Sequence, residues 1–372
     1  MKSIVDKVLK ETKEKSAEEQ AAEMLSPDDE ELRKLVESMQ VNIKIVGCGG
    51  GGSNTINRLF HEGIVGADLI ALNTDAKHLL TIKAQKKILI GKKLTRGLGA
   101  GAIPEIGEKA AQEAEDEIRE AIKGAHIVFI TAGMGGGTGT GSAYYVARMA
   151  KEEGALVMAV VTMPFKAEGI QRMENAKKGL EKLRRVCDTT IVIPNDRLLE
   201  IVPRMPLDAA FKVADEILMQ SIKGLTEIIT KPGLVNLDYN DVRTIMEGAG
   251  MAMIGIGESD ATSNRVEEAM NEALTSPLLG DVDISEGKGA LIRVVGGPDM
   301  TIAEAERAAA MVTEKISNNA RVIWGCSVEP ELERTIRVLL VVTGVKSAHI
   351  MGADSAPSHL SADADDEIDF VR

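Results

Sequence analysis

Three glycine-rich segments have the clearest chemical potential in this sequence. Residues 47–54 read GCGGGGSN and fit the pattern GxGxxG, and residues 133–141 read GMGGGTGTG. Each follows an apolar, β-type run and precedes a helical stretch, so backbone N–H groups and the positive end of a helix can hold phosphate there. A third segment, residues 97–102, reads GLGAGA and can supply further amides. The pattern predicts a site for a polyphosphate ligand.

The first glycine segment alone admits two other interpretations. It fits a nicotinamide-dependent dehydrogenase, in which Asp75, 23 residues after Gly52, would hold the ribose. It also fits a close helix–strand crossing that needs glycine only for packing. The second segment favours a polyphosphate, because two helix N-termini facing one ligand suit several negative charges, and Thr138 and Thr140 can add hydroxyl donors. The dehydrogenase remains the alternative from another class.

Charge compensation for the phosphates must have an unusual source. The sequence contains no GxxxxGK[ST] segment, so the lysine that neutralises phosphate in P-loop enzymes is missing. We expect the amides of residues 97–102 to lie beside the terminal phosphate and a Mg²⁺ ion to bridge the phosphates. The sequence does not identify protein ligands for that ion.

These segments need a framework that brings them to one edge of a sheet. Apolar, β-rich runs occur at residues 41–47, 67–76, 126–133, 155–165 and 188–195, with amphipathic helical stretches between most of them. This alternation predicts an α/β fold with a doubly wound, mostly parallel sheet. Because chains beyond about 250 to 300 residues split into domains, a chain of 372 residues should hold a second domain.

The second domain follows a long helical segment at residues 207–230. Its β-type runs lie at residues 251–259, 289–297, 321–328 and 335–344, with helical stretches at 263–275 and 301–317. We expect a smaller α+β domain with a four-stranded sheet and two helices. The predicted organisation is a charged helical extension (1–40), a nucleotide-binding domain (41–206), a central helix (207–230), a C-terminal domain (231–350) and a tail (351–372).

Composition excludes several functional classes. No apolar run approaches the roughly 18 residues of a membrane span, and no secretory signal is present. The three cysteines Cys48, Cys187 and Cys326 are far apart, without a CxxC pair, which predicts a reducing compartment such as the cytoplasm. The net charge of -13 is concentrated at the ends, with 11 acids and 7 bases in residues 1–40 and 6 acids and one arginine in residues 353–372. Without a basic face, nucleic acid is not an expected partner.

The motifs resemble, in order, those of FtsZ, the tubulin-like GTPase family of cell division. GGGTGTG at residues 135–141 matches the tubulin-superfamily signature in its FtsZ form. NTDA, TRGLGAGAIPEIG, PFKAEG, IPNDRLL, KPGLVNLDYNDVR and AMIGIGES extend the resemblance from about Val41 to Val345, and KKILIGKKLTRGLGAG is closest to archaeal members. The resemblance implies a tubulin-like fold, GTP hydrolysis to GDP with Mg²⁺, and a cytoplasmic polymer at the mid-cell division ring. A related tubulin-like role in cell shape is the nearest alternative.

The resemblance also implies a set of nucleotide-binding residues. They are Gly50, Gly51, Gly52, Ser53, Asn54, Gly137, Thr138 and Gly139 on the phosphates, Ala100, Gly101 and Ala102 near the γ-phosphate, Glu168 and Arg172 at the ribose, Asn195, Phe211 and Asp215 around the base, and Asp75. A carboxylate such as Asp215 accepts from N1–H and the exocyclic amino group of guanine, a pattern that adenine lacks. The predicted base is therefore guanine. Ile103 stands where many members carry asparagine, which removes one polar contact near the γ-phosphate.

The groups that activate water are expected to come from a second copy of the chain. Residues 236–241 match the family's synergy loop, which a neighbouring subunit inserts over the nucleotide. By this resemblance Asp238 and Asp241 would orient the water and interact with the cation, and Asn236 would contact the γ-phosphate region. Without the resemblance the segment is an Asx-rich turn. Such a head-to-tail contact need not close, so it predicts a filament whose GTPase activity depends on assembly.

The last seven residues, DEIDFVR, resemble the C-terminal peptides by which FtsZ proteins bind membrane tethers. Ile368, Phe370 and Val371 would be the anchors, and many copies along a filament would add avidity. The alternative is an acidic tail that only increases solubility.

Overall fold

The computed structural model describes residues 41–201, 206–231, 233–235, 237–280, 282–317 and 319–345. The predicted extension 1–40 and the tail 351–372 lie outside the described residues, and so does Asn236. The predicted tether anchors in the tail are therefore not described. The residues that are described belong to one compact unit.

Six parallel strands form the first half of a sheet. They are β1 (Ile43–Cys48), β2 (Ala67–Asn73), β3 (Lys86–Leu89), β4 (Ile127–Gly133), β5 (Leu156–Met163) and β6 (Thr189–Pro194), in the spatial order β3-β2-β1-β4-β5-β6. Five of them are the predicted strands. The edge strand β3 is new, because a four-residue segment with two lysines carries no clear apolar signal. The strand order reverses beside β1, as in a doubly wound fold.

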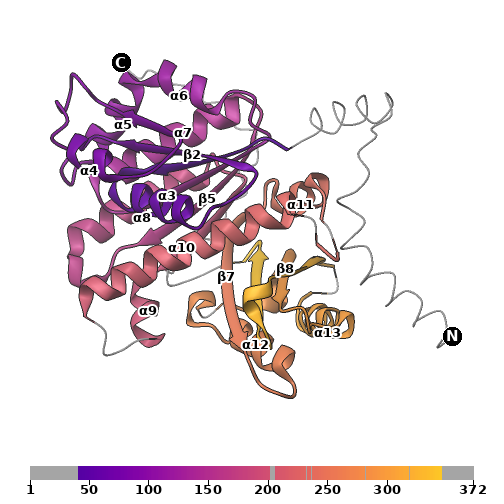
Figure 1. The fold of residues 1–372 in the computed structure, drawn as a ribbon. Helices are drawn as coiled ribbons and strands as arrows, with labels where there is room; N and C mark the ends of the chain where they lie inside the picture. Colours follow the sequence, from indigo (N-terminus) through magenta and orange to yellow (C-terminus); the bar gives the residue numbers. More distant parts are fainter. Residues whose placement is uncertain are drawn as a thin grey trace, which may run out of the picture. The chain divides into compact units, whose positions relative to one another are not determined.

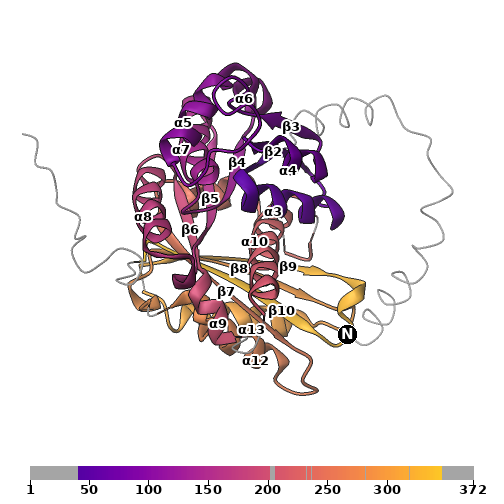
Figure 2. The same cartoon turned by 90° about the vertical axis from the view of Figure 1, so that its left-hand side faces the viewer.

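Helices cover both faces of these strands. One face carries α5 (Pro104–Glu113), α6 (Glu115–Ile122), α7 (Gly137–Glu152) and α8 (Ile170–Arg184), and the other carries α3 (Gly49–His61), α4 (Ala76–Thr81) and α10 (Leu207–Thr230). Successive strand residues point to opposite faces, so Ile45 packs with Leu59 of α3 while Val46 belongs to the core under α7. Figure 2 shows α5, α7 and α8 on one side of the strands and α3, α4 and α10 on the other.

The long helix α10 leads through α11 (Tyr239–Met246) into the predicted second pattern. Its elements are β7 (Gly250–Ser259), α12 (Arg265–Leu274), β8 (Gly289–Gly296), α13 (Ile302–Thr313), β9 (Arg321–Val328) and β10 (Ile336–Thr343). Short helical pieces complete the described chain: η1 (Lys166–Glu168), α9 (Asn195–Ile201), η2 (Pro277–Leu279), η3 (Ile284–Glu286) and η4 (Pro330–Leu332). Four strands and two main helices are found where they were predicted, and Figure 1 shows them below α10.

The two sets of strands are joined edge to edge. Residues 189–191 of β6 pair in parallel with residues 250–252 of β7, so that one ten-stranded sheet runs through β6-β7-β10-β8-β9. The sequence predicted a separate four-stranded sheet. The join is decided by tertiary structure, because strand partners far apart in sequence leave no local pattern.

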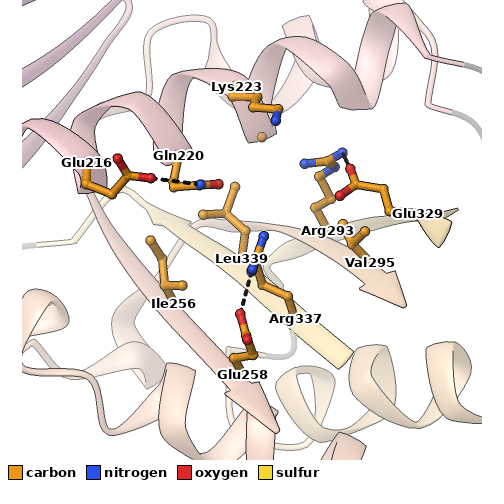
Figure 3. A pocket seen from close by; sticks show the side chains of 11 residues that line it. Glu216, Gln220, Lys223, Ile256, Glu258, Arg293, Val295, Glu329, Arg337 and Leu339 are labelled. Atoms are coloured by element: carbon orange, nitrogen blue, oxygen red, sulfur yellow. Dashed lines mark hydrogen bonds and ion pairs between the residues drawn. The ribbon is translucent and has the colours of Figure 1, made fainter. Parts of the chain in front are cut away.

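A hollow of about 220 Å³ lies between part of α10 and the second set of strands. Figure 3 shows Glu216, Gln220 and Lys223 reaching it from α10 and Arg293 reaching it from β8. Arg293 also pairs at 2.8 Å with Glu227 of α10, and both side chains are almost fully buried. This ion pair ties the long helix to β8. Among the described helices none is long and apolar enough to cross a membrane.

Candidate functional site

The first glycine segment is largely the first turn of a helix. Helix α3 begins at Gly49, directly after β1, so residues that the sequence placed in a loop are helical. Its first four N–H groups have no partner within the helix and carry its positive dipole. A side chain at Gly52 would place its Cβ 2.3 Å from the carbonyl oxygen of Thr131 on β4. Glycine is therefore needed here because the helix lies directly against the neighbouring strand.

The helical period divides the five residues predicted to bind phosphate here. Gly50, Gly51 and Asn54 lie on the accessible side of α3, whereas Gly52 and Ser53 are buried. The side chain of Ser53 is fully buried, and its hydroxyl oxygen has no hydrogen-bond partner among the described residues. The side-chain positions of Gly52 and Ser53 thus face the packed side of the turn, so a phosphate contact by either residue would use its backbone N–H group.

The second glycine segment forms the start of α7. Gly136 precedes the helix, and it and Thr138 are the accessible residues, while Gly137 and Gly139 are buried against neighbouring backbone. The Gly137 N–H already donates to the carbonyl oxygen of Gly101 at 2.9 Å, which leaves the later N–H groups of the first turn for a ligand. Gly137 and Gly139 therefore have a packing role, and their contact with phosphate stays a prediction.

The two threonines of this segment have different environments. The Thr138 hydroxyl lies 2.7 Å from the hydroxyl of Thr74, at the end of β2. The Thr140 hydroxyl accepts the N–H of Gly135 at 2.8 Å, and its side chain is buried. Thr138 can therefore present a polar atom to a ligand, whereas Thr140 stabilises the loop itself.

The third glycine segment lies beside the other two. The Gly99 N–H donates to the Thr74 carbonyl oxygen at 3.1 Å, and the Asn175 side-chain amide donates to the Ala102 carbonyl oxygen at 2.9 Å. Ala100 is buried, while Gly101, Ala102 and Ile103 are exposed. The backbone of these residues thus borders the space in front of α7.

Asp75 and a histidine that the sequence did not single out organise the end of β2. Asp75 caps α4 by accepting the N–H of His78 at 3.0 Å. The His78 ring lies 3.0 Å from the side chain of Asn73 and 3.0 Å from the side-chain oxygen of Asn54. Asp75 therefore caps the helix that carries His78, and the His78 ring contacts the side chain of Asn54. The only sequence signal for His78 was its position three residues after a capping aspartate.

Two of the three residues predicted to surround the base, Phe211 and Asp215, line an open hollow of about 520 Å³ between α3 and α10, whereas Asn195 does not. The lining of this hollow also includes Asn54. Burial raises the pKa of Asp215 to about 6, against the opposing influence of the Arg58 charge and of the Asn54 side chain. The ring of Phe211 stands edge-on to that of Phe165, with centroids 5.1 Å apart. A carboxylate held between an aromatic ring and an amide suits the edge of a purine base.

Asn195, Glu168 and Arg172 lie at the ends of the next strands. Asn195 directly follows β6, is 4% exposed, and has a side-chain oxygen without a partner among the described residues, as expected for a group that awaits a ligand. Glu168 accepts the Phe165 N–H at 2.9 Å and forms an ion pair with Arg172 one helical turn later. All these residues follow the carboxyl ends of the parallel strands, which is where ligands bind in such folds.

Asp238 and Asp241 lie at the opposite end of the same strands. They open α11 as a capping box, in which Asp238 accepts the Asp241 N–H at 2.8 Å and Asp241 accepts the Asp238 N–H at 3.3 Å. The Tyr239 hydroxyl donates at 3.4 Å to the carbonyl oxygen of His126, the residue before β4. The phosphate segment begins at the other end of β4, about 20 Å away at 3.3 Å per residue. The acids and the phosphate segments of one chain are therefore not brought together.

Comparison with known proteins identifies the family to which this arrangement belongs. The model of the Tubulin/FtsZ family, GTPase domain, matches residues 42–203, and that of the FtsZ family, C-terminal domain, matches residues 250–346. "Cell division protein FtsZ 1" of Archaeoglobus fulgidus is 53% identical over the whole of both chains. The chain belongs to the FtsZ family. A second FtsZ 1, from Thermococcus kodakarensis, is 58% identical over 89% of this chain and 88% of its own.

Solved structures agree with the FtsZ assignment. An FtsZ dimer of M. jannaschii, described as empty, superimposes with a TM-score of 0.82 at 56% identity, covering 86% of this chain and 93% of that one. CetZ2 from Haloferax volcanii, at 21% identity and a TM-score of 0.71, shares the fold. The predicted fold and GTPase activity are thus confirmed, and the nicotinamide alternative is wrong. The roles of individual residues stay predictions. The described residues contain no cluster of three or more histidine, cysteine or acidic side chains that could hold a metal.

Proposed function

We propose that this FtsZ-family GTPase assembles head to tail and hydrolyses each GTP at the contact between two copies. The main support is the separation of the two half-sites. The phosphate-binding turns follow the carboxyl end of β4, whereas Asp238 and Asp241 open α11 beside its amino end, about 20 Å away along the strand. Only a second copy, stacked in the same orientation, brings such acids to this chain's nucleotide.

In the bound state, different residues of the chain would contact the phosphates, the base and the ribose. The N–H groups at the start of α3 and α7 would meet the phosphates, with the Thr138 hydroxyl beside them. Phe211 and Asp215 would hold the guanine edge and face, with Asn195 beside the base. Glu168, already oriented by its Phe165 and Arg172 contacts, would meet the ribose. A Mg²⁺ ion, when bound, would reduce phosphate charge, and the hydroxyl pair of Thr74 and Thr138 offers it oxygen donors of the kind it prefers.

The neighbouring copy would contribute the carboxylates that act on water. In the capping box Asp238 uses Oδ1 and Asp241 uses Oδ2, so each acid keeps one carboxylate oxygen for other partners. These oxygens can accept hydrogen bonds from the attacking water and orient it toward the γ-phosphate. Asn236, the third predicted residue, would approach the γ-phosphate region from the same loop. Completion of a site in trans is worth about 10³ to 10⁵ in rate in other GTPases.

The names of the relatives support a role in cell division. Several archaeal proteins that are more than 50% identical over most of this chain are named cell division proteins. We therefore propose that the polymer builds the cytoplasmic division ring at mid-cell. The C-terminal residues Ile368, Phe370 and Val371 would bind a membrane-tether protein, since the sequence DEIDFVR has apolar side chains spaced among acids.

The deciding experiment removes the negative charge of Asp238 at the start of α11 and keeps its helix cap. Asparagine caps helices as well as aspartate, so Asp238→Asn should fold and bind GTP normally and lose about 10³-fold in turnover. Asp283→Asn is the matched control, because Asp283 caps η3 in the same way at a distant, exposed position. Turnover by Asp238→Asn at the rate of the parent protein would exclude the split site. Turnover per molecule should also rise with protein concentration from near zero.

A further inference from the structure

We infer that His126 and Tyr239 are positioning residues of the reaction, forming a strut that holds the acids of α11 in place for the neighbouring copy. The inference rests on the proposed function above, because it concerns the acids that act in trans. Tyr239 is the first residue of α11 and lies between Asp238 and Asp241 in the sequence. Its side chain packs against the core and its hydroxyl reaches the backbone of His126, so it attaches the turn that carries the acids to the sheet.

Tyr239 contacts both the backbone and the ring of His126. The Tyr239 hydroxyl donates to the His126 carbonyl oxygen at 3.4 Å, and the two rings meet edge to face with centroids 6.0 Å apart. Tyr239 is partly buried and packs against the core cluster on the α10 side of the sheet. Aromatic pairs of this geometry favour one relative orientation of the two rings. The first turn of α11 is therefore held at a defined place on the sheet.

His126 is itself immobilised by the sheet. Its carbonyl oxygen also accepts the Leu156 N–H at 2.9 Å, and its own N–H donates to the Asn42 carbonyl oxygen at 2.8 Å. The ring nitrogen Nδ1 accepts the Asn42 N–H at 2.9 Å, so the imidazole cannot rotate without losing that bond. The Asn42 side chain in turn donates to the Gly124 carbonyl oxygen at 3.1 Å. The strut therefore ends at His126, which hydrogen bonds to Asn42 and Leu156 hold in place.

The rest of α11 is attached along its buried side. Leu237 just before the helix and Val242, Ile245 and Met246 within it are buried, and the Met246 carbonyl oxygen accepts the hydroxyl of Thr189 at 2.5 Å. Loss of the Tyr239 contact would remove the bond between the start of α11 and the backbone before β4, so that the exposed acids of the first turn could shift. A displacement of about 1 Å in groups that position a reactant can cost about 100-fold in rate. Strand β4 also links the strut to the phosphate segment at its other end, so one rigid strand sets the spacing of the two half-sites.

Three variants test the strut by GTP turnover at saturating GTP. Tyr239→Leu removes the ring and should lower kcat about 100-fold, Tyr239→Phe removes only the hydroxyl and should lower it several-fold, and His126→Ala should lie between them. GTP affinity, polymer mass by sedimentation and melting temperature should stay near those of the parent protein. Tyr144→Phe, at a tyrosine of α7 whose ring lies under Lys182, is the matched control and should have the parent kcat.

A double variant separates positioning from general damage. If Tyr239 acts through the acids, Tyr239→Phe should have no further effect on kcat in an Asp238→Asn background. Slow Asp238→Asn combined with parent kcat in both Tyr239 variants would overturn the strut and leave the split site intact. Parent kcat in Asp238→Asn would instead overturn the proposed function. A multiplicative loss in the double variant would show that Tyr239 acts independently of Asp238, and would overturn the strut as well.

Discussion

Asp215 gives the sharpest link between the physics of the site and a measurable property. Its carboxyl group lies in the hollow between α3 and α10, where burial raises its pKa from 3.8 to about 6. The ionised form, which guanine requires, is thus the form that the free protein tolerates least. We expect Asp215→Asn to stabilise the nucleotide-free protein at neutral pH and to abolish selection of guanine.

The size of the stability gain from Asp215→Asn and its pH dependence follow from the difference between the folded and unfolded pKa of Asp215. The shift from 3.8 to about 6 corresponds to about 3 kcal/mol at 1.36 kcal/mol per pKa unit, and partial exposure reduces this to about 1 to 3 kcal/mol. The pKa of Asp215 is higher in the folded protein than in the unfolded chain, so folding favours its protonated form. Its contribution to stability is therefore most favourable below pH 3.8 and is lost as the pH rises through 6. The gain from Asp215→Asn should therefore be full at pH 7.5, about half at pH 5, and near zero at pH 3.8.

The assay is urea unfolding of nucleotide-free protein at several pH values. Glu62→Gln is the matched control, since Glu62 lines the same hollow, and this variant should not gain stability over the parent protein. A gain for Asp215→Asn that is equal at pH 7.5 and pH 5, or a loss at pH 7.5, would refute the reasoning. In binding assays the variant should prefer xanthosine triphosphate to GTP, because asparagine presents a donor and an acceptor that match the N1–H and 2-carbonyl of xanthine.

Three further predictions concern the framework. Gly52→Ala should push α3 away from β4, since the new Cβ would lie 2.3 Å from the Thr131 carbonyl oxygen. Equilibrium unfolding should show a loss of stability of about 2 kcal/mol or more, and a binding assay should show weaker GTP binding. Unchanged stability and binding would contradict this contact. Arg293→Ala should lower the free energy of unfolding by about 3 to 5 kcal/mol, because the buried carboxylate of Glu227 would keep only Lys231 as a charged partner among the described residues. A loss under about 1 kcal/mol in urea unfolding would show that the pair is dispensable. Asp75→Ala should cost about 1 kcal/mol through the lost α4 cap and weaken GTP binding; unchanged binding would argue against the role of His78.

Much of the fold could be predicted from the sequence, because its signals are local. Apolar β-type runs at residues 126–133 and 155–165 correspond to β4 and β5, and the long helical segment corresponds to α10 (Leu207–Thr230). Strand β3 was missed, since KKIL is short and basic. The helical starts at Gly49 and Gly137 were also missed, because glycine has low helix propensity and only packing against neighbouring strands requires it there.

The sequence by itself determined the family, the order of most strands and helices along the chain, and the residue types that can hold a guanine nucleotide. These depend on periodicity and on short motifs, which are properties of neighbouring residues. Tertiary structure alone decided which side of each glycine turn is accessible, the raised pKa of Asp215, and the position of Asp238 and Asp241 beside the amino end of β4. Burial and distance depend on segments that are far apart in the chain, so no local pattern could contain them.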